Sequence, residues 1–181
     1  LSNIEEQVGG VPVICHDIFS NGIDYITLMF DAKDISQEDI PYLGLLRGVL
    51  GLVDTASYTY GELSNAINIY TGGIGCGFSV YPNVIEDDET DIEFEIRIRV
   101  LKDQIGKAFE LVGEILHTSK LEDTRRLAEL ITQAKSRLQA TLSSSGHIAA
   151  AMRSMSYGSL YGYYQDATSG IAYYDAICQM D

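Results

Sequence analysis

The sequence predicts an α+β fold, with a mostly antiparallel sheet and helices layered on one face. Residues 91–101 alternate between apolar and charged side chains, which is typical of an antiparallel strand with one face on a core. Residues 59–70 and most of the chain after residue 105 carry apolar side chains at helical spacing. The expected order is therefore two strands, two helices, two strands and then only helices.

Composition limits the kinds of partner. The 181 residues are 46% hydrophobic, which is enough for one globular core. Twelve basic residues against 26 acidic ones give a net charge of −14, and this argues against nucleic acid or an anionic membrane as partner, because both attract basic surfaces. The charge is compatible with basic peptide ligands and equally with simple solubility. No apolar run approaches the roughly 20 residues of a membrane span.

We expect two segments. Residues 1–10 are polar, end in Gly9-Gly10 and read as a linker, and residues 11–181 read as a single α+β domain. The sequence begins at Leu1 and not at methionine, so we expect a fragment of a longer protein. The three cysteines are widely spaced, which favours reduced thiols in a cytosolic setting.

The first half of the domain should alternate strands and helices. Residues 11–15 form a short strand with Pro12 near its start, as at a sheet edge. Residues 23–30 are apolar on both faces, which predicts a central strand or one covered on both sides. Residues 40–52 form a helix with Pro41 in its first turn, and Gly44, Gly48 and Gly51 allow close approach of another backbone.

The next stretch predicts a capped helix, a stop and a strand. Thr59 is the N-cap and Glu62 completes a capping box. Gly72 and Gly73 end the helix, because glycine adopts left-handed dihedrals without a Cβ penalty. The following strand places apolar side chains on one face and small or polar ones on the other. The two sets are Ile74, Cys76, Phe78 and Val80, against Gly75, Gly77, Ser79 and Tyr81.

Residues 82–90 form an acidic loop, with Glu86, Asp87, Asp88 and Glu89 in a row. A calcium site is the alternative, but the alternating ligand spacing and the glycine of such loops are missing, so we favour a solvated loop. In the strand that follows, the charged face carries Glu93, Glu95, Arg97 and Arg99.

The rest of the chain is helical. One helix is set by Phe109, Val112, Ile115 and Leu116. A longer helix of about 20 residues is set by Leu127, Leu130, Ile131, Ala134, Leu138 and Leu142. Ser145 can cap the next helix, and Gly170 is a hinge or cap. The tyrosines of the tail could stack on a ligand, but tyrosine at these spacings more often packs in a core or an interface.

Several motifs carry a resemblance to a known family. YGELSNAINIYTGGI (60–74) resembles the third domain of the presequence-protease branch of the insulinase, or pitrilysin-type, zinc metallopeptidases. SNGIDYITLMFDAKDI (20–35) and IPYLGLLRGVLGLVDTASYTY (40–60) precede it in the same order, and LEDTRRLAELITQAKSRLQ (121–139) follows it. The similarity covers nearly the whole chain.

The resemblance implies a non-catalytic domain of a clamshell-shaped metalloendopeptidase that degrades unfolded peptides. The other domains of the same polypeptide and the peptide substrates would be its partners. Zinc would be held in another domain by H-x-x-E-H. His16, His117 and His147 each lack the second histidine at i+4, so we expect no catalytic residue, no metal ligand and no cofactor in this chain. The fragment is also expected to stop short of the domain's last element.

In that family the exposed sheet face borders an enclosed substrate chamber. Glu93, Glu95, Arg97 and Arg99 are therefore candidates to line the chamber, while the simpler interpretation is a solvated face with weak cross-strand pairs. A different class of function, an inactive homologue that serves as a scaffold or partner-binding module, stays open. The resemblance places the protein in the bacterial cytoplasm, or in an organelle matrix if it is eukaryotic.

Two other motifs invite a functional interpretation. Gly72 to Gly77 is glycine-rich, but a phosphate-binding loop requires a strand before the glycines and a helix after them, and here that order is reversed. Cys76 lies between apolar neighbours with no base nearby in the sequence, so core packing is favoured over a nucleophile.

Overall fold

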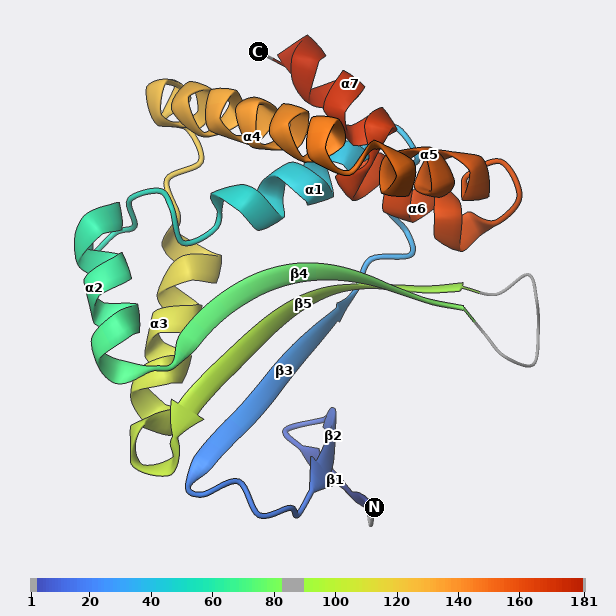
Figure 1. Cartoon of the computed structure of the whole chain (residues 1–181). Coiled ribbons are helices and arrows are strands. Elements are labelled where there is room, and N and C mark those ends of the chain that lie inside the picture. The colour runs from blue at the N-terminus through green and yellow to red at the C-terminus, as the bar shows by residue number, and fades with distance from the viewer. Residues whose placement is uncertain (1–2, 83–89, 181) are drawn as a thin grey trace.

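A computed structural model describes residues 3–82 and 90–180, and it has the predicted α+β class. Its main sheet consists of β3 (Ile23–Asp31), β4 (Gly73–Pro82) and β5 (Thr90–Leu101). The strand order is β3-β5-β4, and both pairings are antiparallel. Figure 1 shows helices along one side of this sheet and a small hairpin on the other side. The acidic loop of residues 86–89 lies outside the described residues.

The position of β3 differs from the sequence-based expectation. The central strand is β5, whereas β3 is at the edge, so the prediction of a central or doubly covered strand is wrong. Ile26 and Leu28 face the core, but Tyr25 and Met29 on the other face stay exposed, Tyr25 at 68%. A run of apolar residues cannot by itself show whether its second face is covered.

The N-terminal residues form a hairpin of β1 (Asn3–Val8) and β2 (Val11–His16). Gly9 and Gly10 make the turn with φ of 62° and 87°, a conformation that glycine adopts without strain. Residues 3–8 of the segment interpreted as a linker therefore form a strand, and the assignment of residues 1–10 as a linker stays a prediction. The strand predicted at 11–15 is confirmed as β2. The start of the compact domain at residue 11 remains a prediction.

Three helices pack directly on the sheet. They are α1 (Ile40–Val49), α2 (Tyr60–Tyr70) and α3 (Ile105–Thr118), which follows the short 3-10 turn Lys102–Gln104. The inward side chains of β5 form one core cluster with Ala108 and Val112 of α3. Phe109, which was expected on the buried face of α3, is 44% exposed, because Ala108 and Leu111 occupy that face.

Four further helices follow and build most of a second layer. They are α4 (Thr124–Ser144), α5 (Gly146–Met155), α6 (Leu160–Ser169) and α7 (Ile171–Met180). The helix α6 also reaches the sheet, where Tyr164 lies against Phe78 of β4. The helix α4 has 21 residues, as the periodicity predicts, and Leu130 packs against Val49 and Val53. Ser145 occupies the N-cap position of α5 but its side chain makes no capping hydrogen bond. Tyr164 and Tyr173 pack in the interior, as favoured for the tyrosine-rich tail.

The capping box of α2 is present as predicted. Thr59 Oγ1 accepts a hydrogen bond from the Glu62 amide, and the Glu62 carboxylate accepts one from the Thr59 amide at 2.9 Å. At the other end, Thr71 Oγ1 donates to the Ile67 carbonyl at 2.7 Å, and the Gly72 amide donates to the Arg99 carbonyl. The chain thus leaves the helix and enters the sheet within two residues.

Gly73 is required by this junction. Its φ of +132° is a conformation that only glycine adopts readily, and a Cβ there would lie 3.3 Å from Arg99 Nη2. We expect Gly73→Val to destabilise the domain by about 1–3 kcal/mol through backbone strain. Chemical denaturation measures this, with Gly75→Val as the matched control because a Cβ at Gly75 meets no atom within 4 Å. Equal midpoints for the two variants would contradict the argument.

Candidate functional site

One face of the main sheet is not covered by the helices, and we call it the open face. The antiparallel register aligns its residues in rows across β3, β5 and β4. The four rows are Tyr25–Arg99–Gly73, Thr27–Arg97–Gly75, Met29–Glu95–Gly77 and Asp31–Glu93–Ser79. All four residues singled out in the sequence therefore lie on the same face, because side chains alternate along a strand.

Glu95 is the exception to the solvated character of this face, since its side chain is only 1% exposed. Tyr81 Oη donates a hydrogen bond to Glu95 Oε1 at 2.5 Å, and Arg97 Nε donates to Oε2 at 2.8 Å. Arg97 Nη2 lies 2.5 Å from the same oxygen. The carboxylate is thus held by two neighbours and is not free to bind a basic ligand.

The pKa of Glu95 reflects two opposing effects. Burial raises it, but the hydrogen bonds from Tyr81, Ser79 and Arg97 outweigh burial, so the pKa lies below the ordinary glutamate value. The hydrogen bond to Glu95 in turn raises the pKa of Tyr81. Glu95 is therefore ionised at neutral pH in spite of its burial.

The two arginines differ in their surroundings. Arg97 is 63% exposed, but Glu95 balances its charge and Ser79 Oγ accepts a further hydrogen bond from Nη2 at 3.3 Å. Arg99 is exposed and forms no ion pair with any residue in the described ranges 3–82 and 90–180. Arg99 thus carries the uncompensated positive charge of this face.

The far end of the open face is acidic. Glu93 pairs across the strands with Asp31, and burial followed by the charges of Asp31, Asp91 and Glu95 raises the pKa of Glu93. Lys33 lies 3.1 Å from Asp31 and partly offsets this charge. The face therefore changes sign along β5, from negative at Glu93 to positive at Arg99.

A shallow depression of about 380 Å³ lies at the positive end. It is lined by Tyr25 and Thr27 of β3, by Arg97 and Arg99 of β5, and by Gly73 and Gly75 of β4, together with parts of the neighbouring backbone. The hollow exists because the two glycines of β4 have no side chains, whereas β3 and β5 carry larger residues at the same positions.

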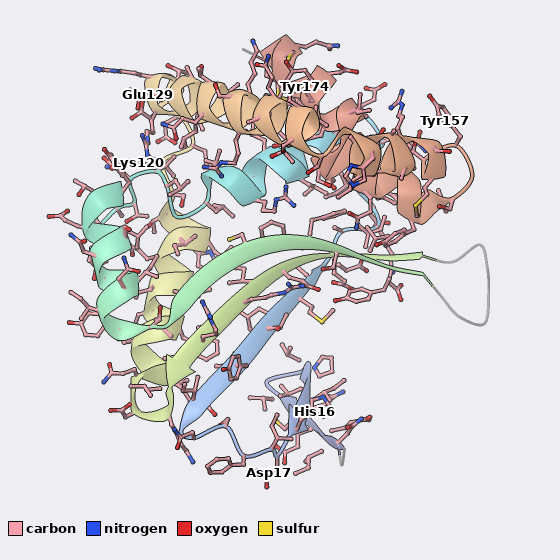
Figure 2. The ribbon with its side chains drawn as sticks, in the orientation of Figure 1. His16, Asp17, Lys120, Glu129, Tyr157 and Tyr174 are labelled. Carbon is pink, nitrogen blue, oxygen red and sulfur yellow. The ribbon has the colours of Figure 1, made fainter. Side chains whose placement is uncertain are left out.

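The residues that the structure describes do not fit a zinc site. His16, His117 and His147 lie on β2, α3 and α5, and Figure 2 shows His16 on the hairpin, apart from the helical layer. Among the residues that the structure describes, no three histidine, cysteine, aspartate or glutamate side chains gather as metal ligands.

Other candidates are structural. Burial raises the pKa of the Cys76 thiol to about 11, which makes it a poor nucleophile, and Cys76 packs in the sheet core as expected. Figure 2 places Tyr157 and Tyr174 in the helical layer, on the opposite side of the sheet from the hairpin. They therefore take no part in the open face.

A second ion pair with a buried carboxylate, between Arg153 and Asp166, was not foreseen from the sequence. Asp166 accepts a hydrogen bond from Arg153 Nη1 at 2.6 Å and one from the Ile171 amide at 2.9 Å. It joins α5, α6 and the first turn of α7, so its role is to hold the second helical layer together.

Of the described helices, none is long and apolar enough to span a membrane.

Comparisons with known proteins agree with the fold and motifs. The family model for the region associated with peptidases of metallopeptidase family sixteen, subfamily C, matches residues 1–180. Protein HypA of Clostridium perfringens is 36% identical over 177 residues, covering 98% of this chain and 18% of that protein. Presequence protease 1 of Arabidopsis thaliana is 28% identical, covering 92% and 15%, and the mitochondrial presequence protease of Drosophila melanogaster is 25% identical, covering 82% and 14%.

The chain therefore spans less than a fifth of the length of these relatives. The similarity to the presequence-protease branch, first indicated by the motifs around YGELSNAINIYTGGI, is confirmed over nearly the whole chain. The matched region covers nearly the whole chain, and the chain has the α+β fold that the motifs predict. The chain belongs to the peptidase-associated family of metallopeptidase family sixteen, subfamily C.

Proposed function

We propose that this chain is a non-catalytic domain of a zinc metalloendopeptidase that degrades unfolded peptides. In this proposal its open face forms part of the wall of the chamber that encloses the substrate. The observation that carries the proposal is the asymmetry of the sheet. Helices cover one face, while Tyr25, Met29 and Arg99 remain exposed on the other.

The relatives support a peptidase as the parent protein, because several are named presequence proteases. In such a parent, zinc and the catalytic groups belong to another domain, and this chain supplies no catalytic residue. The exposed apolar face of the hairpin supports the idea that it contacts another domain of the same polypeptide. Ile4, Val8 and Val11 lie on this face. A two-stranded hairpin is marginally stable alone and gains stability when such a face is covered.

The contribution of a chamber wall is binding at a distance from the bond that is cut. Contacts remote from the scissile bond hold a long peptide and can be used to orient it, which short peptides cannot exploit. Tyr25 and Met29 offer apolar surface to an extended peptide, and Arg99 offers a charge. Peptides are the proposed partners, rather than nucleic acid or a membrane, because the net charge is −14. The bacterial cytoplasm, or an organelle matrix in a eukaryote, is the proposed compartment.

Site-specific photocrosslinking tests the wall. A photoreactive amino acid at Thr27, which is exposed on the open face, should crosslink a long unfolded peptide to the full-length parent protein. The matched control places the same group at Arg125, whose side chain is 91% exposed on α4 in the helical layer. We expect peptide crosslinks at position 27 and only background at 125.

Two results would change the interpretation. Equal crosslinking at both positions would show that the open face has no special contact with the peptide, and the wall proposal would fail. Crosslinking at 27 by a parent that does not cleave peptides, even when loaded with zinc, would favour the inactive scaffold or partner-binding module instead.

A further inference from the structure

The depression at the positive end of the open face has features that the fold alone does not require. It is bounded by two neighbouring rows, Tyr25–Arg99–Gly73 and Thr27–Arg97–Gly75. In both rows the central strand carries an arginine and β4 carries a glycine. The hollow therefore lies beside two guanidinium groups and against bare backbone.

Gly75 is the informative glycine. Its φ is not in the range that favours glycine, and a Cβ added there would meet no atom within 4 Å. Glycine weakens the interior of a strand, where β-branched residues are preferred. The domain itself would thus accommodate a larger residue, and the small one leaves room for the backbone of another molecule to approach.

Arg99 supplies the charge for such a molecule. It makes no ion pair within the part of the chain that the structure describes, whereas Glu95 neutralises Arg97. In a protein with a net charge of −14, this is a local site of positive potential that a carboxylate can use. The planar guanidinium can bind a carboxylate with two parallel hydrogen bonds.

We propose that this depression is a carboxylate-binding subsite for an extended peptide. Arg99 pairs with an acidic side chain of the peptide, and the peptide backbone passes over Gly73 and Gly75. Tyr25, which is exposed beside Arg99, packs against the neighbouring peptide residue. The subsite rests on the proposed chamber wall, and it adds the kind of side chain that the wall selects.

The acidic end of the face gives the bound peptide a direction. Glu93 lies six residues along β5 from Arg99, about 20 Å at the rise of a strand, and Asp31 of β3 is its cross-strand partner. They repel carboxylates and attract basic side chains. A peptide with an acid at one end and a base at the other therefore binds with the acid at Arg99.

Equilibrium binding to the full-length protein tests the subsite. Fluorescence anisotropy is measured with two amidated, labelled peptides of about ten residues, identical except that one contains a glutamate where the other contains glutamine. A chelator is present, so that cleavage does not interfere. The wild type should bind the glutamate peptide about tenfold more tightly at low salt, and the preference should shrink as salt rises.

Three variants sharpen the result. Arg99→Gln should abolish the preference and bind both peptides alike, and its fold should be unaffected because Arg99 has no ion pair to lose among the described residues. Gly75→Val should weaken both peptides, because it fills the hollow without a clash in the domain. Arg125→Gln, on the exposed side of α4, is the control and should behave as the wild type.

Equal binding of both peptides by the wild type, or an unchanged preference in Arg99→Gln, would overturn the subsite. The photocrosslink at position 27 separates this failure from failure of the wall itself. Crosslinking without a glutamate preference would leave the wall in place and remove only the carboxylate subsite.

Discussion

Gly44→Ala is expected to destabilise the domain by about 1–3 kcal/mol, because it forces an added methyl group into a packed helix contact. A Cβ at Gly44 would lie 2.7 Å from Tyr173 Cε2 and 2.8 Å from the carbonyl oxygen of Thr168. The tyrosine ring is buried, and the carbonyl belongs to the backbone of α6, so neither can move without separating α1 from α6 and α7. Chemical denaturation of the purified variant measures the loss.

Gly48 provides a matched control on the same helix. It is exposed, and a Cβ there would meet no atom within 4 Å. Gly48→Ala should therefore stabilise the domain by about 0.5–1 kcal/mol, since alanine loses less conformational entropy in a helix. If both variants change stability in the same direction, the close contact at Gly44 does not limit the packing of α1.

Glu95→Ala is expected to cost about 1–3 kcal/mol at neutral pH, because it removes a buried carboxylate that accepts hydrogen bonds from Tyr81 and Arg97. This loss of stability is smaller than the loss caused by breaking a fully buried ion pair, because Arg97 is largely exposed and water can solvate it in the variant. Denaturation midpoints at a series of pH values measure the effect.

The pH dependence distinguishes this carboxylate from a merely well-packed side chain. The pKa of Glu95 in the folded state lies below the ordinary value of 4.5, so ionisation favours folding. Its stabilisation is present above about pH 4.5 and is lost as the pH falls through the folded-state pKa. The difference between wild type and Glu95→Gln should therefore shrink in acid.

Glu93→Gln is the control of opposite sign. Burial and the nearby charges of Asp31, Asp91 and Glu95 raise the pKa of Glu93, so its ionised form opposes folding. Its contribution is favourable below the unfolded pKa and is lost as the pH rises through the folded pKa, so this variant should lose nothing at neutral pH. A Glu95→Gln difference that does not vary with pH would contradict the role assigned to the ionised carboxylate.

These two sites bear on the open face as a whole. The four charged residues at alternate positions of β5 look equivalent in the sequence, but their surroundings and ion pairs differ in the structure. Glu95 holds Arg97 in place, Glu93 belongs to an acidic end, and Arg99 presents a positive charge without an ion-pair partner among the described residues. Their common face is confirmed by the register, while their part in a chamber wall stays a proposal.

The sequence by itself determined the local features of this protein. Alternation in β5, the capping box of Thr59 and Glu62, and the glycine-dependent exit from α2 depend on neighbours within a few residues, so they can be predicted from spacing and side-chain chemistry. The family resemblance is equally accessible, because its motifs lie in one order along the chain.

Only the tertiary structure decided what depends on distant residues. The strand β3 lies at the edge because it pairs only with β5, some 70 residues later in the chain. The order of apolar residues within β3 does not show which strand it pairs with. Glu95 is buried because Tyr81 approaches it from the adjacent strand, and Gly44 differs from Gly48 because Tyr173 of α7 packs on one of them. Burial and ion pairing arise from such contacts across the fold, which no local pattern records.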